Sequence, residues 1–186
     1  MRIKKTIMFL LLAVLLIFTA ACGKKAEANK EKTNVQFFKD HSMALMIPRS
    51  FERLATQADC DAYAKKKGYR EIKLDNKNNQ LVFYLTETQH STLIKEVASD
   101  IDKNIRRIPN AGGPYANITA IEHNDDFTVF RVTVKDKKLT AEDKKLFGFL
   151  ITYGQRYNVY CGTTNKKVSV IFTDSKGNVI EERTSE

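Results

Sequence analysis

The side chains best suited to chemistry in this 186-residue chain are few and widely spaced. Its three histidines, His41, His90 and His123, are too scattered for the ligand spacing of a zinc site. Neither an H-E-x-x-H nor a C-x-x-C motif occurs. Residues Asp40–Ser42 include the three residue types of a hydrolase triad, but neighbours in a turn cannot form the relay geometry. The sequence therefore predicts no catalytic residue, no metal site and no cofactor.

The N-terminal segment has the residue order of a secretory signal peptide. Three basic residues lie within the first five positions, an apolar run covers residues 7–18, and small residues follow at 19–21. A membrane-spanning helix needs about 20 apolar residues, and this run is shorter. We therefore predict that residues 1–21 are a signal peptide that is removed from the mature protein.

Cys22 follows this segment directly and is the residue whose chemistry the sequence defines best. Thr19–Cys22, "TAAC", resembles the lipobox of bacterial lipoproteins, in which the cysteine carries a diacylglycerol thioether; Thr19 departs from the leucine usual there. The alternative is an ordinary signal peptidase site that cuts before the same cysteine. That cut would leave an exposed thiol open to oxidation and mixed disulfides. We therefore expect lipidation of Cys22 and a location on the extracytoplasmic face of the cell membrane.

Residues 22–33 are predicted to be the lipidated cysteine and a flexible tether. The tether, Gly23–Thr33, has no large apolar residue to bury, and eleven residues reach at most roughly 35 to 40 Å when fully extended. Removal of the signal peptide takes three from the 31 Lys+Arg and none from the 22 Asp+Glu, so the net charge falls from +9 to +6. The remaining lysines alternate with acids, as in residues 135–145, which argues against a nucleic-acid partner.

Residues 34–186 are predicted to form one globular domain, long enough to fold on an apolar core alone. They contain two cysteines, Cys60 and Cys161, in a compartment where disulfides persist. A bond between them would close a loop of about 100 residues and contribute about 4 to 5 kcal/mol in chain-entropy models. Two separately buried thiols are the alternative, and the sequence alone leaves both open.

Hydrophobic periodicity predicts an alternation of strand pairs and helices in this domain. A helix with Thr56 at its start and Gly68 at its end precedes the second strand pair. A second helix, which ends before Pro109, carries a stripe of isoleucines and valine at three- and four-residue steps. The four predicted strand pairs are 34–38 with 43–47, 69–74 with 80–86, 116–123 with 127–135, and two strands within 167–182.

The segment Thr140–Gly162 fits either a third helix or a long strand. As a helix it has Thr140 and Asp143 as caps at its start, and its length exceeds the usual length of a strand. Two internal glycines oppose a helix by about 1 kcal/mol each relative to alanine. We favour the helix, which gives an α+β fold in which an antiparallel sheet built from hairpins carries about three helices.

Five stretches of the domain carry a resemblance to a known group of proteins. They are "MIPRSF", "AYAKKKGYREIKLDNKNNQLVFYLT", "ITAIEHNDDFTVFRVTV", "YGQRYNVYCG" and "KVSVIFTDSKGNVI". Together they are similar to small lipoproteins of Gram-positive bacteria. The resemblance implies a tethered α+β domain and no catalytic residue.

The sequence leaves three functional classes to compare. We expect a non-enzymatic, lipid-anchored module that binds an envelope protein or a wall component. The alternative is a carrier of a small apolar or aromatic ligand, in a pocket between the third helix and the sheet bordered by Tyr153 and Tyr157. An enzyme would require His90 or His123 to meet an acid in a cleft.

Overall fold

The computed structural model describes residues 33–109 and 112–186, so the predicted signal peptide, Cys22 and most of the tether lie outside the described residues. Residues Glu31–Glu186 form one compact unit, which starts close to the predicted domain boundary at residue 34. Within the described part of the chain, no helix combines the length and the apolar character needed to cross a membrane.

The first four strands form one antiparallel sheet, which we call sheet 1. Its spatial order is β1-β2-β4-β3, and the strands are β1 (Val35–Phe37), β2 (Ser42–Pro48), β3 (Glu71–Asp75) and β4 (Gln80–Thr86). Leu45 lies opposite Phe83, and Ile47 lies opposite Leu81. Alternate residues of a strand point to the same face, so these side chains make one buried face of sheet 1.

Two helices cover this buried face. The helix α2 (Gln57–Lys67) follows the short 3₁₀ turn η1 (Arg49–Phe51), and α3 (Glu87–Arg107) follows β4 directly. Thr56 begins α2, and Thr86 begins α3, each through a capping box. The buried stripe of α3 is Leu93, Val97, Ile101 and Ile105. Both predicted helices are therefore confirmed.

The last four strands form a second sheet, sheet 2, in the order β5-β6-β7-β8. They are β5 (Ile118–His123), which follows the 3₁₀ turn η2 (Gly113–Tyr115), β6 (Val129–Val134), β7 (Ser169–Thr173) and β8 (Val179–Thr184). The α+β class and the three helices are confirmed. The strands divide into two sheets rather than one, and β6 pairs with β7 in parallel because a helix connects them.

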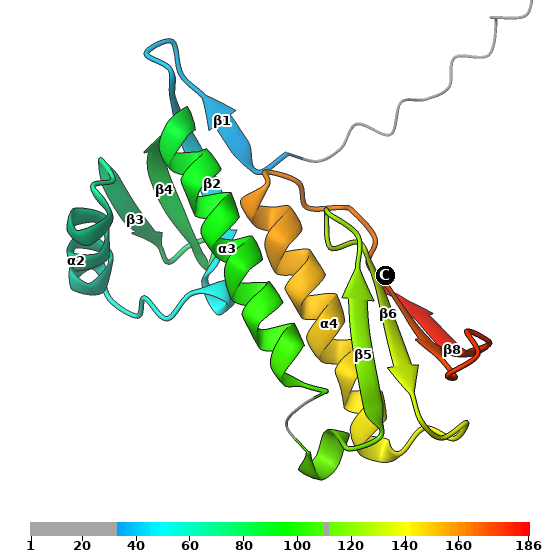
Figure 1. Cartoon of the computed structure of the whole chain (residues 1–186). Helices are drawn as coiled ribbons and strands as arrows, with labels where there is room; N and C mark the ends of the chain where they lie inside the picture. Colours follow the sequence, from blue (N-terminus) through cyan, green and yellow to red (C-terminus); the bar gives the residue numbers. More distant parts are fainter. Residues whose placement is uncertain (1–32, 110–111) are drawn as a thin grey trace, which may run out of the picture. The chain divides into compact units, whose positions relative to one another are not determined.

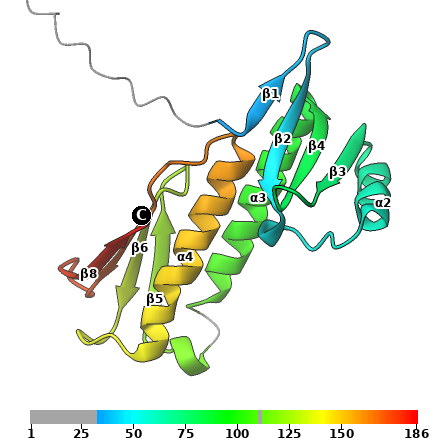
Figure 2. The same ribbon diagram turned by 180° about the vertical axis from the view of Figure 1, so that it is seen from behind.

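That connecting helix is α4 (Ala141–Tyr160), so the helical interpretation of Thr140–Gly162 is confirmed. The Thr140 hydroxyl accepts a hydrogen bond from the Asp143 backbone, and the Asp143 carboxylate accepts one from the Thr140 backbone. The helix contacts β2 of sheet 1 and β7 of sheet 2. Figures 1 and 2 show α3 and α4 side by side, with sheet 1 on one side of the pair and sheet 2 on the other.

The two glycines of α4 are predicted to respond in opposite ways to alanine. A Cβ on Gly154 would lie 2.3 Å from the Phe127 carbonyl oxygen and 2.7 Å from Val168, whereas a Cβ on Gly148 would meet nothing within 4 Å. We expect Gly154→Ala to lower the free energy of unfolding by about 1 to 3 kcal/mol. Gly148→Ala should raise it by about 0.5 to 1 kcal/mol. Urea unfolding of both variants checks this, and equal effects would contradict the close packing of α4.

Candidate functional site

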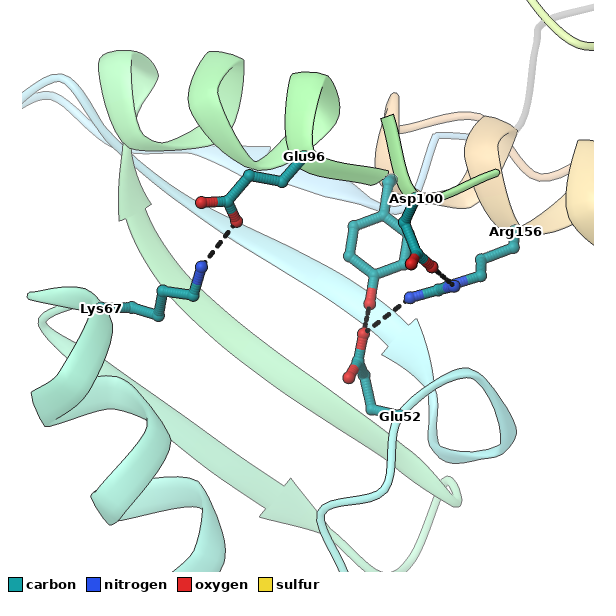
Figure 3. A network of polar contacts seen from close by, with 6 residues as sticks. Glu52, Lys67, Glu96, Asp100 and Arg156 are labelled. Carbon is teal, nitrogen blue, oxygen red and sulfur yellow. Dashed lines mark hydrogen bonds and ion pairs between the residues drawn. The ribbon is translucent and has the colours of Figure 1, made fainter. Parts of the chain in front are cut away.

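A network of charged and polar side chains joins the two central helices to the loop after η1. Arg156 of α4 lies between two carboxylates: its Nη2 is 3.6 Å from Glu52 Oε1, and its Nη1 is 3.2 Å from Asp100 Oδ2 of α3. The Tyr160 hydroxyl donates to the same Glu52 oxygen. Figure 3 shows how Glu52, Asp100 and Arg156 converge, and how Lys67 of α2 reaches Glu96 of α3 at 2.7 Å.

The electrostatics of this network suit a structural role. Tyr160 is fully buried, and burial followed by the nearby charge of Glu52 raises the pKa of its hydroxyl. A tyrosine in that setting keeps its proton and acts as a donor, so it cannot serve as a base or a nucleophile near neutral pH. The network instead fixes the positions of α3, α4 and the loop after η1 relative to one another.

His123 does meet an acid, as an enzyme would require. Its Nε2 lies 2.8 Å from Asp102 Oδ1 of α3, its Nδ1 lies 2.8 Å from the Asn124 carbonyl oxygen, and its ring stacks on Phe127 at 4.3 Å. Both ring nitrogens therefore face acceptor atoms of the protein itself. The contact ties β5 to α3.

His90 makes a hydrogen bond between two helices, and His41 lies in a turn. His90 Nε2 lies 2.6 Å from the Tyr160 carbonyl oxygen and must donate to it, which ties the start of α3 to the end of α4. His41 lies in the β1–β2 turn with a φ of 60°. The described residues contain no group of three or more His, Cys, Asp or Glu side chains that could hold a metal ion.

The disulfide that the sequence allowed is not formed, since Cys60 and Cys161 are both free thiols. Cys60 is fully buried in α2, which packs on β3, whereas Cys161 follows α4 and lies beside Val35 of β1. Strands β1 and β3 are the opposite edges of sheet 1, about 14 Å apart, and a disulfide tolerates a Cα separation of only about 7 Å. Burial raises the pKa of both thiols, which makes them poor nucleophiles.

The N-terminal half of α4 and β8 border an open groove of about 570 Å³, which we call the α4 groove. Its apolar surface comes from Phe147, Phe149 and Tyr153, and Phe149 is 52% exposed. The remaining lining residues are Lys144, Lys145, Gly148, Thr152 and Arg183. The groove therefore combines the exposed ring of Phe149 and the half-buried ring of Tyr153 with three basic side chains.

Acidic neighbours hold these basic side chains in place. Lys144 Nζ lies 2.9 Å and Arg183 Nη2 lies 2.7 Å from the carboxylate of Glu181. The Arg183 guanidinium also lies 4.4 Å from the centre of the Phe147 ring. Hydrogen bonds from Lys144 and Arg183 lower the pKa of Glu181, so its carboxylate stays ionised. The groove can therefore hold an apolar or aromatic group, and the basic side chains at its border are already paired with acids of the protein.

The structure brings only one of the two predicted groove residues to this surface. Tyr153 lines the α4 groove, but Tyr157 packs against Phe127 of the β5–β6 turn, with ring centres 4.7 Å apart. Sequence reasoning missed Phe149 and Arg183. Phe149 shares a face with its apolar neighbours only if the segment is a strand, and it lies off the apolar stripe of the helix that we favoured. Nothing in the sequence places β8 beside α4.

A second groove, the β1 groove, lies between β1 and the first half of α3. Its volume is about 370 Å³, and its lining is mostly apolar. The lining residues are Thr33, Val35, Phe37, Met43, Glu87, His90, Ser91, Ile94, Lys95, Cys161 and Gly162. The groove exists because α3 covers the middle of sheet 1 and leaves its β1 edge open.

Comparison of the chain with protein-family models, with curated proteins and with solved structures gives no match. The resemblance to small lipoproteins of Gram-positive bacteria therefore stays a prediction.

The half-buried Tyr157 and the fully buried Tyr160 predict a loss of stability at alkaline pH. Burial raises the pKa of Tyr157 to about 12 and raises that of Tyr160 as well. The folded state thus holds these protons more tightly than the unfolded state, in which tyrosine ionises near pH 10. We expect full stability from both groups below about pH 10 and a progressive loss as the pH rises towards about 12.

Urea midpoints at about pH 8, 10 and 11.5 measure this effect. The variants Tyr157→Phe and Tyr160→Phe remove one ionising hydroxyl each. The urea midpoint of each variant should therefore fall less between pH 10 and about 11.5 than that of the wild type. An unchanged fall in both variants would contradict the burial of these hydroxyls.

Proposed function

We propose that the mature protein is a lipid-anchored, extracytoplasmic binding module without enzymatic activity. Cys22 carries the lipid, the tether connects it to the domain, and the α4 groove holds an envelope protein or a wall component. The observation that supports binding most directly is the α4 groove, where the exposed Phe149 ring and the half-buried Tyr153 ring lie beside basic side chains. Exposed aromatic and arginine side chains are enriched where proteins bind partners.

The anchor is supported by the sequence around Cys22, where an apolar run and small residues precede the cysteine. A single acyl chain holds a protein on a bilayer only reversibly, whereas two chains hold it stably, at about 0.8 kcal/mol for each buried methylene. A diacylglycerol thioether on Cys22 supplies two chains. The non-enzymatic part of the proposal is supported by the structural contacts of His90, His123 and Tyr160.

A carrier of a small aromatic ligand is the second candidate. The α4 groove falls within the roughly 300 to 1,000 Å³ typical of ligand pockets, and Tyr153 borders it as that function requires. A carrier predicts a compound that raises the melting temperature of the protein but not that of Phe149→Ala. A docking surface predicts no such compound and a macromolecular neighbour instead.

The anchor predicts that Cys22→Ala releases the protein from the membrane fraction into the medium. The matched control is Cys161→Ala, which should leave the protein on the membrane. Mass spectrometry of the wild-type N-terminal peptide should show a diacylglycerol-modified cysteine. An unmodified thiol in a membrane-free protein would contradict the proposal.

The binding function predicts a specific neighbour at Phe149. A photo-reactive amino acid at position 149 should cross-link one envelope component in intact cells. The same group at Val179, which is 60% exposed on β8 outside the α4 groove, should not. Phe149→Ala should reduce co-purification of that component while unfolding free energy changes by less than about 0.5 kcal/mol. Identical products from both positions would argue against a binding role for the groove.

A further inference from the structure

The β1 edge of sheet 1 presents apolar side chains that α3 covers only in part. Val35 and Phe37 lie opposite Leu45 and Met43, so they point to the buried face of the sheet. At this edge that face opens into the β1 groove, and Phe37 is 67% exposed. A large apolar side chain exposed to this degree beside an apolar groove is unusual for a surface that meets only water.

A second aromatic side chain extends the exposed surface around the tip of the hairpin. Phe38 follows β1 directly, is 39% exposed, and stacks on Tyr84 of β4 with ring centres 6.5 Å apart. The Phe38 backbone amide donates to the Ser42 carbonyl and so closes the turn to β2. Phe37 and Phe38 therefore lie on opposite faces of one hairpin tip. If the tip entered a lipid layer, both rings would be inserted together.

The chain enters the domain at this same edge, at a fixed point. The Asn34 side chain is buried and donates to the Met46 and Val159 carbonyl oxygens, at 2.5 and 3.0 Å. Thr33 forms a bridge with Thr163 and lines the β1 groove. The proposed lipid on Cys22 lies eleven residues before Thr33, a reach of at most roughly 35 to 40 Å. The β1 edge is thus the first part of the domain that follows the proposed anchor along the chain.

Charges around the edge also suit a lipid surface. Lys39 is exposed in the hairpin turn, and Lys95 lines the β1 groove. The nearby Asp40 lies 3.8 Å from Arg70, which offsets its charge, and Glu87 is the acid in the groove lining. Four lysines of the tether precede this edge. Basic residues next to a membrane are attracted to anionic lipids.

We infer that the β1–β2 hairpin and the β1 groove form a membrane-contacting surface, in which Phe37 and Phe38 enter the interface of an anionic bilayer. The inference rests on the proposed lipid anchor and adds an orientation to it. The anchor raises the local concentration of lipid around the domain, so even a weak second contact is populated. The two contacts together hold the domain in one orientation on the membrane surface.

Fluorescence of a single tryptophan tests this orientation, because the chain contains no tryptophan. The test variant is Phe37→Trp, and the matched control is Phe149→Trp on α4; both replace an exposed phenylalanine. Each full-length, lipidated protein is reconstituted in vesicles of phosphatidylglycerol and phosphatidylcholine, with or without brominated acyl chains. We expect a shift to shorter wavelength and a loss of intensity with brominated lipid for Phe37→Trp, and neither change for Phe149→Trp.

The other outcomes overturn the inference in distinguishable ways. If both proteins float with the vesicles but Phe37→Trp is not quenched, the anchor stands and the hairpin contact fails. If Phe37→Trp is shielded from iodide but not quenched by brominated lipid, a second copy of this chain covers the β1 groove instead. Equal quenching of both variants would exclude a preferred orientation. If neither protein floats, the anchor fails, and the inference fails with it.

Discussion

The packing of α4 between the two sheets is the constraint on which the rest of the domain depends. Each sheet has one apolar face that must be buried, and α4 contacts strands of both. At Gly154 the helix has no room for a side chain, because the Phe127 carbonyl and the Val168 side chain occupy that space. One turn earlier, Leu150 is fully buried, so the apolar stripe continues along the helix. A helix further from sheet 2 would open the core.

This placement of α4 explains the charged network beside it. Arg156 lies on the side of α4 that faces α3, where its guanidinium is largely removed from water, and burial of an unpaired charge costs several kcal/mol. Glu52 and Asp100 supply opposite charges from two other elements, and Tyr160 donates to Glu52 as well. An ion pair of this kind adds little net stability but disfavours other arrangements of the same helices. The network is thus a consequence of how α3, α4 and the loop after η1 pack together.

Local signals in the sequence predicted the elements well, because caps and periodicity act within a few residues. Thr56, Thr86 and Thr140 all form capping boxes, although only the first and last were identified from the sequence.

The division into two sheets was missed because the parallel pairing of β6 with β7 spans the whole of α4. The network was missed for the same reason, since Glu52 and Arg156 are about a hundred residues apart and share no spacing rule. Tyr153 was predicted because the spacing of aromatic residues within one helix can be read from the sequence. Arg183 was missed because it lies on β8, which comes beside α4 only through strand pairing in sheet 2.

The two grooves differ in ways that suit two different roles. The β1 groove lies at the edge of sheet 1 where the described part of the chain begins. The α4 groove is bordered by the first half of α4, and Figures 1 and 2 show that α4 begins at the end of the domain away from the β1–β2 hairpin. A domain held through Phe37 and Phe38 would therefore present Phe149 and Tyr153 away from the lipid, where a partner in the envelope can reach them. The same placement of α4 that buries both sheets thus separates the β1 edge from the α4 groove.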